Sequence, residues 1–451
     1  MFGNKLLCLL ALCFLRASAS VTVRKTGRGP TGYEVDFKYV NTTASRVLIG
    51  GGMQAFTDQY HTTLESRAWY HPRDYRPGDF YVSYGSPEEG YEWPYEMTSD
   101  GDDGVWTYTT PLPSGIYSYA YLIDCDWAPD CGIDTGQLVI DPDVPPFLNV
   151  QGDQVASSFQ VPFDARFQGT DDISADFDYA LPAPHKYRGT VKSVNYTSPG
   201  SIHPAPDVHH FGLYLPAGYG EKKEEEKGKT YPLLYLSHGA GGNGNDWENL
   251  GRMSHIMDNL IAGGHIEPTV VVMPSFYNLD ASLPRFVYGN SSGRDGIPSS
   301  DFIRANYQRY LFPWVEENLQ NVCAEPRCRA FAGLSWGGRL TYEMFVNATG
   351  YFDYYGMFSP ATDPPYLDNE TLAANPALAD KGVFVAYGLY DFVFDSGRAL
   401  EAALSGVDIQ FVSRVTPFGG HYWNTWQDEL WWFGVKALWK PAPFSARTGR
   451  S

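Results

Sequence analysis

The sequence has few charged residues, and it contains no apolar run long enough to cross a bilayer. Charged residues make up 19% of the 451 residues, and 52 acidic against 33 basic residues give a formal net charge of −19. This charge disfavours nucleic acid and anionic membrane surfaces as partners, because both are negatively charged themselves. The length allows two or three domains, and the hydrophobic fraction of 43% is that of a globular chain.

The first residues predict a secretory signal peptide over 1–19. Lys5 supplies a positive charge, Leu6–Leu15 is a short apolar stretch, and Ala17-Ser18-Ala19 fits a cleavage site made of small residues. The apolar stretch is too short to span a membrane. We therefore expect a secreted, extracellular protein.

Cysteines are scarce, and two of the six lie within the predicted signal. The remaining even number favours disulfide bonds in a secreted chain. A metal site is less favoured, because no cysteine pair has a zinc-like Cys/His spacing, and we expect no metal and no cofactor. The simplest pairing joins sequence neighbours, Cys125 with Cys131 and Cys323 with Cys328. N-glycosylation sequons fit the same compartment and occur at Asn41, Asn195, Asn290, Asn347 and Asn369.

The spacing of turns and apolar runs predicts two domains. Residues 20–150 hold short strand-like runs between Gly, Pro and Asp turns, which indicates a small β-sandwich. Residues 151–184 are polar and irregular, and predict a linker or strap that packs in part on one domain. In residues 185–440 strands alternate with helices, as in a mostly parallel sheet covered on both faces. The tail, 441–451, is expected to be disordered.

The predicted elements can be given by their ranges. Strands are expected at Val21–Val23, Tyr33–Tyr39, Arg46–Ile49, Val105–Thr109, Tyr117–Ile123, Leu233–Leu236, Val270–Met273, Arg329–Ala332, Val383–Tyr387 and Ile409–Val415. Helices are expected near 248–262, 301–320, 338–346, 396–405 and 427–438. The charged run Glu221–Lys229 is expected to be a solvated hairpin tip.

The run Gly333–Gly338 has the pattern of a nucleophile elbow around Ser335. In such an elbow a serine sits on a sharp strand-to-helix turn, and small neighbours are needed because the two backbones crowd together. An apolar run precedes Ser335 and a helical pattern follows it. A second copy of the pattern surrounds Ser291, but the Gly and Pro residues after it cannot open a helix. The sequence therefore predicts Ser335 as the nucleophile.

A serine hydroxyl needs a base, and the base needs an orienting acid. His421 follows the last predicted strand in a Gly-Gly-His loop, and no other histidine lies after His265. Asp391 follows a strand at its carboxyl end, where active sites of such sheets gather. Asp395 is the alternative acid, although it is better placed as a helix N-cap. We predict His421 as the base and Asp391 as the acid.

An oxyanion hole needs two preorganised N–H donors. Trp336, directly after the nucleophile, should supply one from its backbone. The Gly-rich loop Ser237–Gly242 follows a predicted strand, and Ala240 is the candidate for the second donor. The aromatic residues Tyr390 and Trp423 are candidates for substrate binding, together with Trp336 and Phe392. The alternative for these aromatic residues is packing in the core.

Three motifs together resemble the esterase D family of α/β-hydrolases. They are Tyr235–Trp247, Gly333–Gly338 and Gly420–Trp426, and the resemblance covers about 185–440. The family includes feruloyl and acetylxylan esterases of plant cell-wall degradation and siderophore (enterochelin) esterases. The resemblance implies the same nucleophile, acid and base as the residues themselves. Residues 20–150 resemble the immunoglobulin-like domain, related to glycogen-binding modules, that precedes such catalytic domains.

The sequence thus predicts a secreted serine carboxylic ester hydrolase, an α/β-hydrolase domain preceded by a small all-β sandwich. The expected substrates are feruloyl or acetyl esters on plant cell-wall polysaccharide, hydrolysed through an acyl-enzyme. One alternative is an esterase for a siderophore or another small ester. An alternative of another class is a catalytically inert carbohydrate-binding protein. The N-terminal domain is expected either to bind glycan or to shape the rim of the active site.

Overall fold

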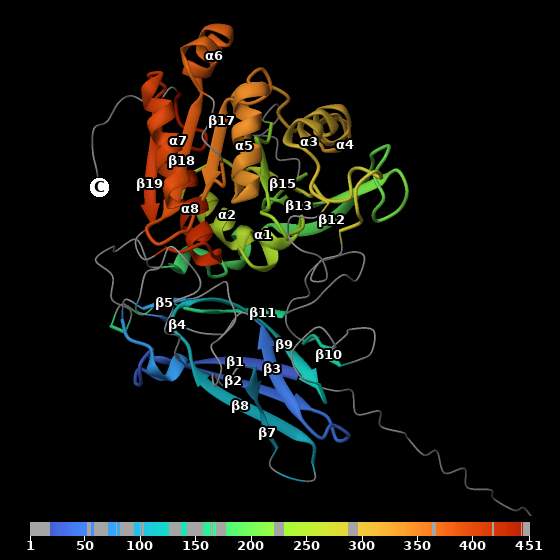
Figure 1. Cartoon of the computed structure of the whole chain (residues 1–451), viewed down its shortest axis with the longest axis vertical. Helices are drawn as coiled ribbons and strands as arrows, with labels where there is room; N and C mark the ends of the chain where they lie inside the picture. Colours follow the sequence, from blue (N-terminus) through green and yellow to red (C-terminus); the bar gives the residue numbers. More distant parts are fainter. Residues whose placement is uncertain are drawn as a thin grey trace, which may run out of the picture.

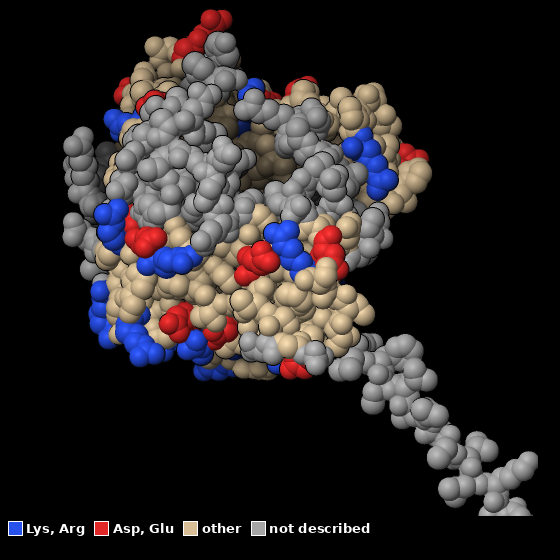
Figure 2. Space-filling model, turned by 60° about the horizontal axis from the view of Figure 1, so that its bottom comes forward, with Lys and Arg blue, Asp and Glu red and all other residues tan. Residues whose placement is uncertain are grey.

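The chain forms a β-sandwich and a larger α/β unit, which lie against each other (Figure 1). This computed structural model describes residues 19–51, 56–57, 71–77, 79–81, 94–99, 101, 103–125, 137–141, 157–162, 164, 166–167, 177–220, 230–286, 296–362, 367–416, 419–442 and 444. Glu221–Lys229, Ser291 and most of the predicted tail lie outside these residues. Figure 2 shows basic and acidic side chains interspersed on one face, with neutral areas between them.

The N-terminal unit consists of two packed antiparallel sheets and a separate pair of short strands, which confirms the predicted all-β sandwich. One sheet has the order β1-β2-β8-β7, and the other has the order β10-β9-β3-β6 with β11 also paired to β9. The bounds are β1 (Ala19–Lys25), β2 (Tyr33–Val40), β3 (Val47–Gly51), β4 (Phe56–Thr57), β5 (Phe80–Tyr81), β6 (Tyr95–Glu96), β7 (Thr98–Ser99), β8 (Val105–Pro111), β9 (Gly115–Ile123), β10 (Leu138–Val139) and β11 (Ser157–Val161).

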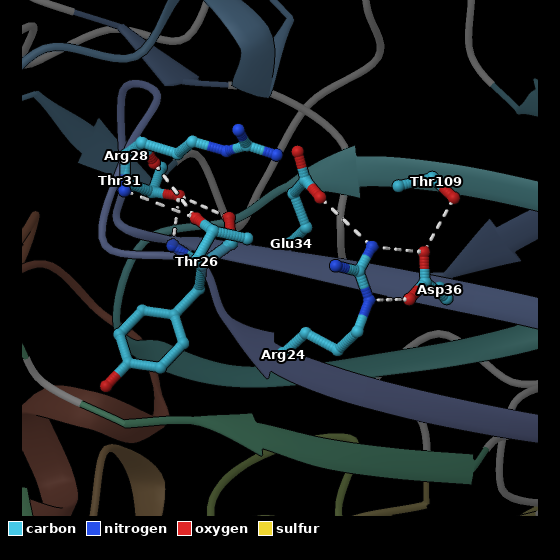
Figure 3. A network of polar contacts seen from close by, with 8 residues as sticks. Arg24, Thr26, Arg28, Thr31, Glu34, Asp36 and Thr109 are labelled. Carbon is cyan, nitrogen blue, oxygen red and sulfur yellow. Dashed lines mark hydrogen bonds and ion pairs between the residues drawn. The ribbon is translucent and has the colours of Figure 1, made fainter.

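Strict alternation along β2 explains why this segment is a strand with one buried face. Tyr33, Val35, Phe37 and Tyr39 all point into the sandwich and are at most 5% exposed. The residues between them face solvent and form polar networks with β1 and β8 (Figure 3). In one network Arg24 pairs with Glu34 at 3.0 Å and also with Asp36, whose other partner is the Thr109 hydroxyl at 2.7 Å. This outer face is therefore charged and rich in threonine.

Two findings refine the predicted boundaries of the sandwich. β11 pairs with β9 along its whole length, so this part of the predicted linker belongs to the sandwich sheet. Ala19, the last residue of the predicted signal, is buried and opens β1 opposite Tyr39. Residues 1–18 lie outside the described residues.

The α/β unit is built on one eight-stranded sheet in the order β12-β13-β15-β14-β16-β17-β18-β19. The first two strands are antiparallel to their neighbours, and the six from β15 to β19 run parallel. This is the predicted mostly parallel α/β-hydrolase sheet. The bounds are β12 (Thr190–Thr197), β13 (Val208–Leu215), β14 (Leu233–Ser237), β15 (Val270–Pro274), β16 (Arg329–Leu334), β17 (Tyr354–Phe358), β18 (Gly382–Gly388) and β19 (Phe411–Thr416).

Helices cover both faces of this sheet, because successive residues of each strand point to opposite sides. On β14, Leu233 and Tyr235 pack in one core cluster with α3, α5 and α7, whereas Leu234 and Leu236 pack in a second with α2 and α8. The described helices are α1 (Asp246–Asn249), α2 (Met253–Ala262), α3 (Ser300–Asn306), α4 (Phe312–Asn318), α5 (Trp336–Asn347), α6 (Asn369–Ala374), α7 (Phe394–Gly406) and α8 (Trp423–Lys436). A π-helical segment, Tyr307–Leu311, joins α3 to α4.

The cysteines give one confirmed pairing. Cys323 and Cys328 form a disulfide bond, as predicted from their spacing. Cys125 is also disulfide-bonded, and its predicted partner, Cys131, lies outside the described residues. Of the predicted glycosylation sites, Asn195, Asn347 and Asn369 are exposed and Asn41 is half-buried, while Asn290 lies outside the described residues.

Candidate active site

The predicted elbow is present as a sharp turn from a strand into a helix, and the backbone at the centre of the turn is strained. β16 ends at Leu334, α5 begins at Trp336, and Ser335 between them has a positive φ of 53°. The glycine before the elbow has no room for a side chain, since a Cβ on Gly333 would lie 2.7 Å from the Gly337 carbonyl carbon. The crowding is what forces the Ser335 side chain out of the fold.

The structure brings Ser335, His421 and Asp391 together in a hydrogen-bonded chain. His421 Nε2 lies 2.9 Å from Ser335 Oγ, and His421 Nδ1 lies 2.8 Å from Asp391 Oδ1. Asp391 is fully buried and its Oδ1 also accepts a hydrogen bond from the Val393 N–H at 3.0 Å. Because a carboxylate only accepts, Nδ1 carries the proton and Nε2 is left to accept from the serine hydroxyl.

The loops after β18 and β19 hold the acid and the base against each other. The Tyr390 N–H donates to the Gly419 carbonyl at 2.8 Å, and the Leu389 N–H donates to the Thr416 carbonyl at 3.0 Å. A Cβ on Gly388 would lie 2.3 Å from the Gly419 oxygen, so the two loops touch at their glycines. This contact explains the Gly-Gly that precedes the histidine.

Asp395, the alternative acid, is exposed and lies in the first turn of α7. The prediction that it caps this helix is wrong, because the N-cap is Val393. A carboxylate in the first turn still interacts favourably with the positive end of the helix dipole. The hydrogen bond to the imidazole is made by Asp391 instead.

The two predicted oxyanion donors belong to the two segments that meet at Ser335. Trp336 is the first residue of α5, and the first N–H groups of a helix have no acceptor within the helix. Ala240 is exposed in the loop after β14, next to Gly239, whose Cβ position is 3.2 Å from Ser335 Cβ. The loop is fixed by a hydrogen bond of 2.7 Å from the Gly241 N–H to the Tyr277 hydroxyl.

Two buried carboxyl groups of the α/β unit, Glu429 and Asp246, were not found from the sequence. Glu429 on α8 is fully buried and accepts a hydrogen bond from Ser359 Oγ at 3.1 Å. Burial raises the pKa of this carboxyl well above its usual value, with a further contribution from the charge of Asp391. Asp246, the first residue of α1, has its pKa raised to about 7 by burial. The sequence does contain a signal for Glu429, because the acidic pair Asp428-Glu429 stands in a helix that is otherwise rich in aromatic residues.

The candidate aromatic residues differ in exposure. Phe392 is 61% exposed, and its ring centroid lies 4.2 Å from that of His421. Trp423 is half-buried and packs edge to face on Trp247 and Trp426, with centroids 5.5 and 5.0 Å away. Tyr390 is also half-buried. These contacts favour packing for Trp423 and leave Phe392 facing solvent beside the imidazole.

Residues 206–441 match the family model described as "Putative esterase", which is just over half of the chain. The chain belongs to this esterase family. The predicted membership of an esterase family is thereby confirmed, and the sheet order agrees with the predicted α/β-hydrolase fold. Within the described residues, no three His, Cys, Asp or Glu side chains cluster as metal ligands would. In the same part of the chain, no helix is both long and apolar enough to cross a membrane.

Relatives of this esterase include one protein named both xylanase and feruloyl esterase and one named xylanase. It is 29% identical over 328 residues to an endo-1,4-beta-xylanase/feruloyl esterase from Xylanibacter ruminicola, covering 72% of this chain and 39% of that protein. It is 27% identical over 202 residues to endo-1,4-beta-xylanase Y from Acetivibrio thermocellus, covering 42% of this chain and 17% of that protein. The chain thus spans well under half the length of either curated relative.

Solved structures of esterases are similar at lower identity. A ferulic acid esterase from Anaeromyces mucronatus in complex with ferulic acid aligns with a TM-score of 0.48 and 19% identity, covering 58% of this chain and 95% of that one. The enterobactin esterase of Shigella flexneri in the presence of enterobactin aligns with a TM-score of 0.49 and 16% identity, covering 91% of this chain and 93% of that one.

Proposed function

We propose that this esterase hydrolyses its substrate through an acyl-enzyme on Ser335. The carrying observation is the hydrogen-bonded chain from Asp391 through His421 to Ser335, at 2.8 and 2.9 Å. His421 Nε2 takes the hydroxyl proton while Oγ attacks the ester carbonyl, and Asp391 holds the tautomer that makes this possible. The backbone N–H groups of Ala240 and Trp336 stabilise the oxyanion.

The intermediate then collapses and the ester C–O bond breaks. The alcohol leaves with the proton from His421, and the acyl group remains on Ser335. Water enters, gives a proton to His421 and attacks the acyl carbonyl. The second collapse breaks the bond to Ser335, returns the proton to Oγ and releases the carboxylic acid, so no cofactor is required.

The preferred substrates in this proposal are feruloyl esters on plant cell-wall polysaccharide, with acetyl esters second. The name of one relative, xylanase/feruloyl esterase, supports the feruloyl group, and both names support a polysaccharide. The exposed ring of Phe392 beside the imidazole also supports an aromatic acyl group. An aromatic acyl group gains from stacking on such a ring, whereas an acetyl group is too small to do so. Esters of small siderophores are the alternative substrates, and activity on them is the comparison that tests this preference.

Secretion and glycosylation are part of the same proposal. The signal-like first residues, the disulfide Cys323–Cys328 and the exposed sequons at Asn195, Asn347 and Asn369 all support an oxidising, extracellular compartment.

A substrate panel tests the proposal. The purified full chain is assayed on methyl ferulate, acetylated xylan and a catechol siderophore, with the Ser335→Ala variant as the blank. We expect kcat/KM to be highest on methyl ferulate and to be lost in S335A. Highest activity on the siderophore would replace the substrate class, and an S335A variant as active as wild type would overturn the mechanism.

A further inference from the structure

The β-sandwich contacts the α/β unit directly beside the proposed catalytic base. Asn424 lies three residues after His421, in the first turn of α8, and its side chain reaches the turn before β9. The Ile116 N–H donates to Asn424 Oδ1 at 2.9 Å, and Asn424 Nδ2 donates to the Ser114 carbonyl at 3.4 Å. One amide thus joins segments more than 300 residues apart in the sequence. Figure 1 shows β9 and β11 on the side of the sandwich that faces α1 and α8.

The sandwich side of this contact is shaped to receive the amide. A Cβ on Gly115 would lie 2.8 Å from Asn424 Nδ2, its nearest neighbour, and 3.1 Å from the Tyr117 hydroxyl; real Cβ atoms essentially never come as close as the first distance. Glycine is needed here for space, since its backbone lies between the two residues that bond the amide. The contact is therefore a fitted pair, Asn424 on α8 and Gly115 at the start of β9, and we name it the Asn424 clamp.

The Asn424 clamp lies at the end of the loop that carries His421, and the proposed reaction requires this loop to be held in place. His421 stands between Gly420 and the first turn of α8, so the position of its ring depends on where that helix begins. On the other side, Trp423 packs on Trp247 within the α/β unit. A second approach from the sandwich is Tyr75, whose pKa is raised mainly by burial and in part by electrostatic interaction with Tyr422. The sandwich therefore bonds to the start of α8 at Asn424, and Tyr75 interacts electrostatically with Tyr422, which follows His421.

We propose that the β-sandwich is a positioning element of the active site, and that Asn424 is the residue through which it acts. The clamp fixes the first turn of α8 and so keeps His421 Nε2 within hydrogen-bond distance of Ser335. This proposal rests on the catalytic role proposed above for His421. Displacing a catalytic group by about 1 Å costs up to about 100-fold in rate, so a modest loosening of the helix start is measurable.

The described part of the sandwich surface supports this role over glycan binding. Among the described residues, the exposed large hydrophobic side chains are Phe302, Leu389 and Phe392, and all three belong to the α/β unit. Aromatic residues of the sandwich, such as Tyr95 and Tyr119, are buried instead. A flat sugar-binding surface needs exposed rings, and the described outer face offers charged and threonine side chains.

The test measures kcat and KM on a small aryl ester for Asn424→Ala, Gly115→Ala and the double variant in the full chain. We expect each single variant to lower kcat about tenfold and to change KM less than twofold, since the clamp acts on the base and not on substrate. In N424A the closest contact of the new methyl group of Gly115→Ala is gone and the Tyr117 ring, 3.1 to 3.2 Å away, is what remains, so the double variant should lose little more than N424A alone. This non-additivity is the signature of a shared contact.

A matched control crosses the same interface at a different place. Ser158 on β11 donates to the Asn249 carbonyl on α1 at 2.7 Å. Ser158→Ala should lower the melting temperature and leave kcat within twofold of wild type. If N424A and G115A also lower only the melting temperature, the clamp is merely structural and the proposal is wrong. If N424A does not fold, G115A alone tests the proposal, again by whether kcat falls or only the melting temperature does.

His421→Ala separates this proposal from the proposed function. An inactive H421A together with fully active N424A and G115A would overturn the positioning role and leave the mechanism intact. An H421A variant that retains wild-type activity would overturn the mechanism, and the positioning role with it.

Discussion

The sandwich and the α/β unit use the same kind of residue in different ways. Both cores are built from buried tyrosine and phenylalanine, such as Tyr119 in the sandwich and Tyr235 in the central sheet. The sandwich sheet turns one face to water, where Arg24 and Asp36 pair in solvent. The central sheet is covered on both faces, so its polar groups gather at the carboxyl ends of the strands. The chemistry is therefore expected only in the α/β unit, with the sandwich supporting it from outside.

The largest expected effect comes from the elbow. Ser335→Ala should lower kcat on a simple aryl ester by about 10⁴-fold or more, because the nucleophile is lost while the fold is kept. Ser291→Ala is the matched control, since Ser291 stands in the second copy of the same sequence pattern and should keep full activity. Equal losses of kcat in both variants would mean that the strand–turn–helix context does not distinguish the nucleophile from the second copy of the pattern.

The next effect distinguishes the two candidate acids. Asp391→Asn should lower kcat by about 10³ to 10⁴-fold, because an amide at this position favours the wrong imidazole tautomer. Asp395→Asn, four residues away on the exposed first turn of α7, should stay within twofold. Steady-state kinetics of both variants at neutral pH check this, and an inactive D395N beside an active D391N would reverse the roles.

A buried carboxyl in the α/β unit should destabilise the fold as the pH rises. Burial raises the pKa of Asp246 from 3.8 to about 7, so the folded state holds a proton that the unfolded state releases. This contribution is complete below about pH 4 and is lost as the pH rises through 7, by up to about 4 kcal/mol. Thermal unfolding between pH 4 and 8 should be flatter in Asp246→Asn than in wild type.

Asp36 of the sandwich is the comparison for Asp246. Its pKa is lowered by Arg24, so its contribution is present above its unfolded pKa and is lost as the pH falls through the folded value. Asp36→Asn should therefore lower the melting temperature at neutral pH, and should change the slope of the unfolding profile only at acid pH. Equal slopes for wild type and D246N between pH 4 and 8 would contradict the neutral state of Asp246.

The smallest of these effects concerns substrate choice at the surface. Phe392→Ala should lower kcat/KM on methyl ferulate about tenfold and on an aryl acetate less than twofold, since only the aromatic acyl group stacks on the ring. Leu389→Ala removes the neighbouring exposed apolar side chain and serves as the control. If both esters lose activity equally in F392A, the ring supports His421 and does not select the acyl group.

The sequence predicted the parts of the site that depend on local backbone. The elbow and the Gly-Gly-His loop are set by short patterns, because glycine is required where backbones touch. Strand β17 was missed, since its run Tyr-Tyr-Gly-Met-Phe has a glycine at its centre and little β-branched character. Strands β12 and β13 were missed as well, although β13 is largely buried in the finished sheet.

Residues whose role depends on tertiary contacts could not be predicted from local sequence patterns. Glu429 becomes an unusual carboxyl only because α8 turns it toward Ser359 and Asp391. Asn424 meets Ile116 only when the two domains are assembled. The N-cap assigned to Asp395 was wrong for a related reason, because the turn of Asp391 that binds His421 also starts the helix, at Val393.

Covalent labelling tests the central claim most directly. The full chain is treated with a fluorophosphonate, digested and analysed by mass spectrometry, with S335A and S291A treated alongside. We expect one adduct, on the peptide that contains Ser335, present in S291A and absent in S335A. An adduct on Ser291, or an active enzyme that acquires no adduct, would contradict it.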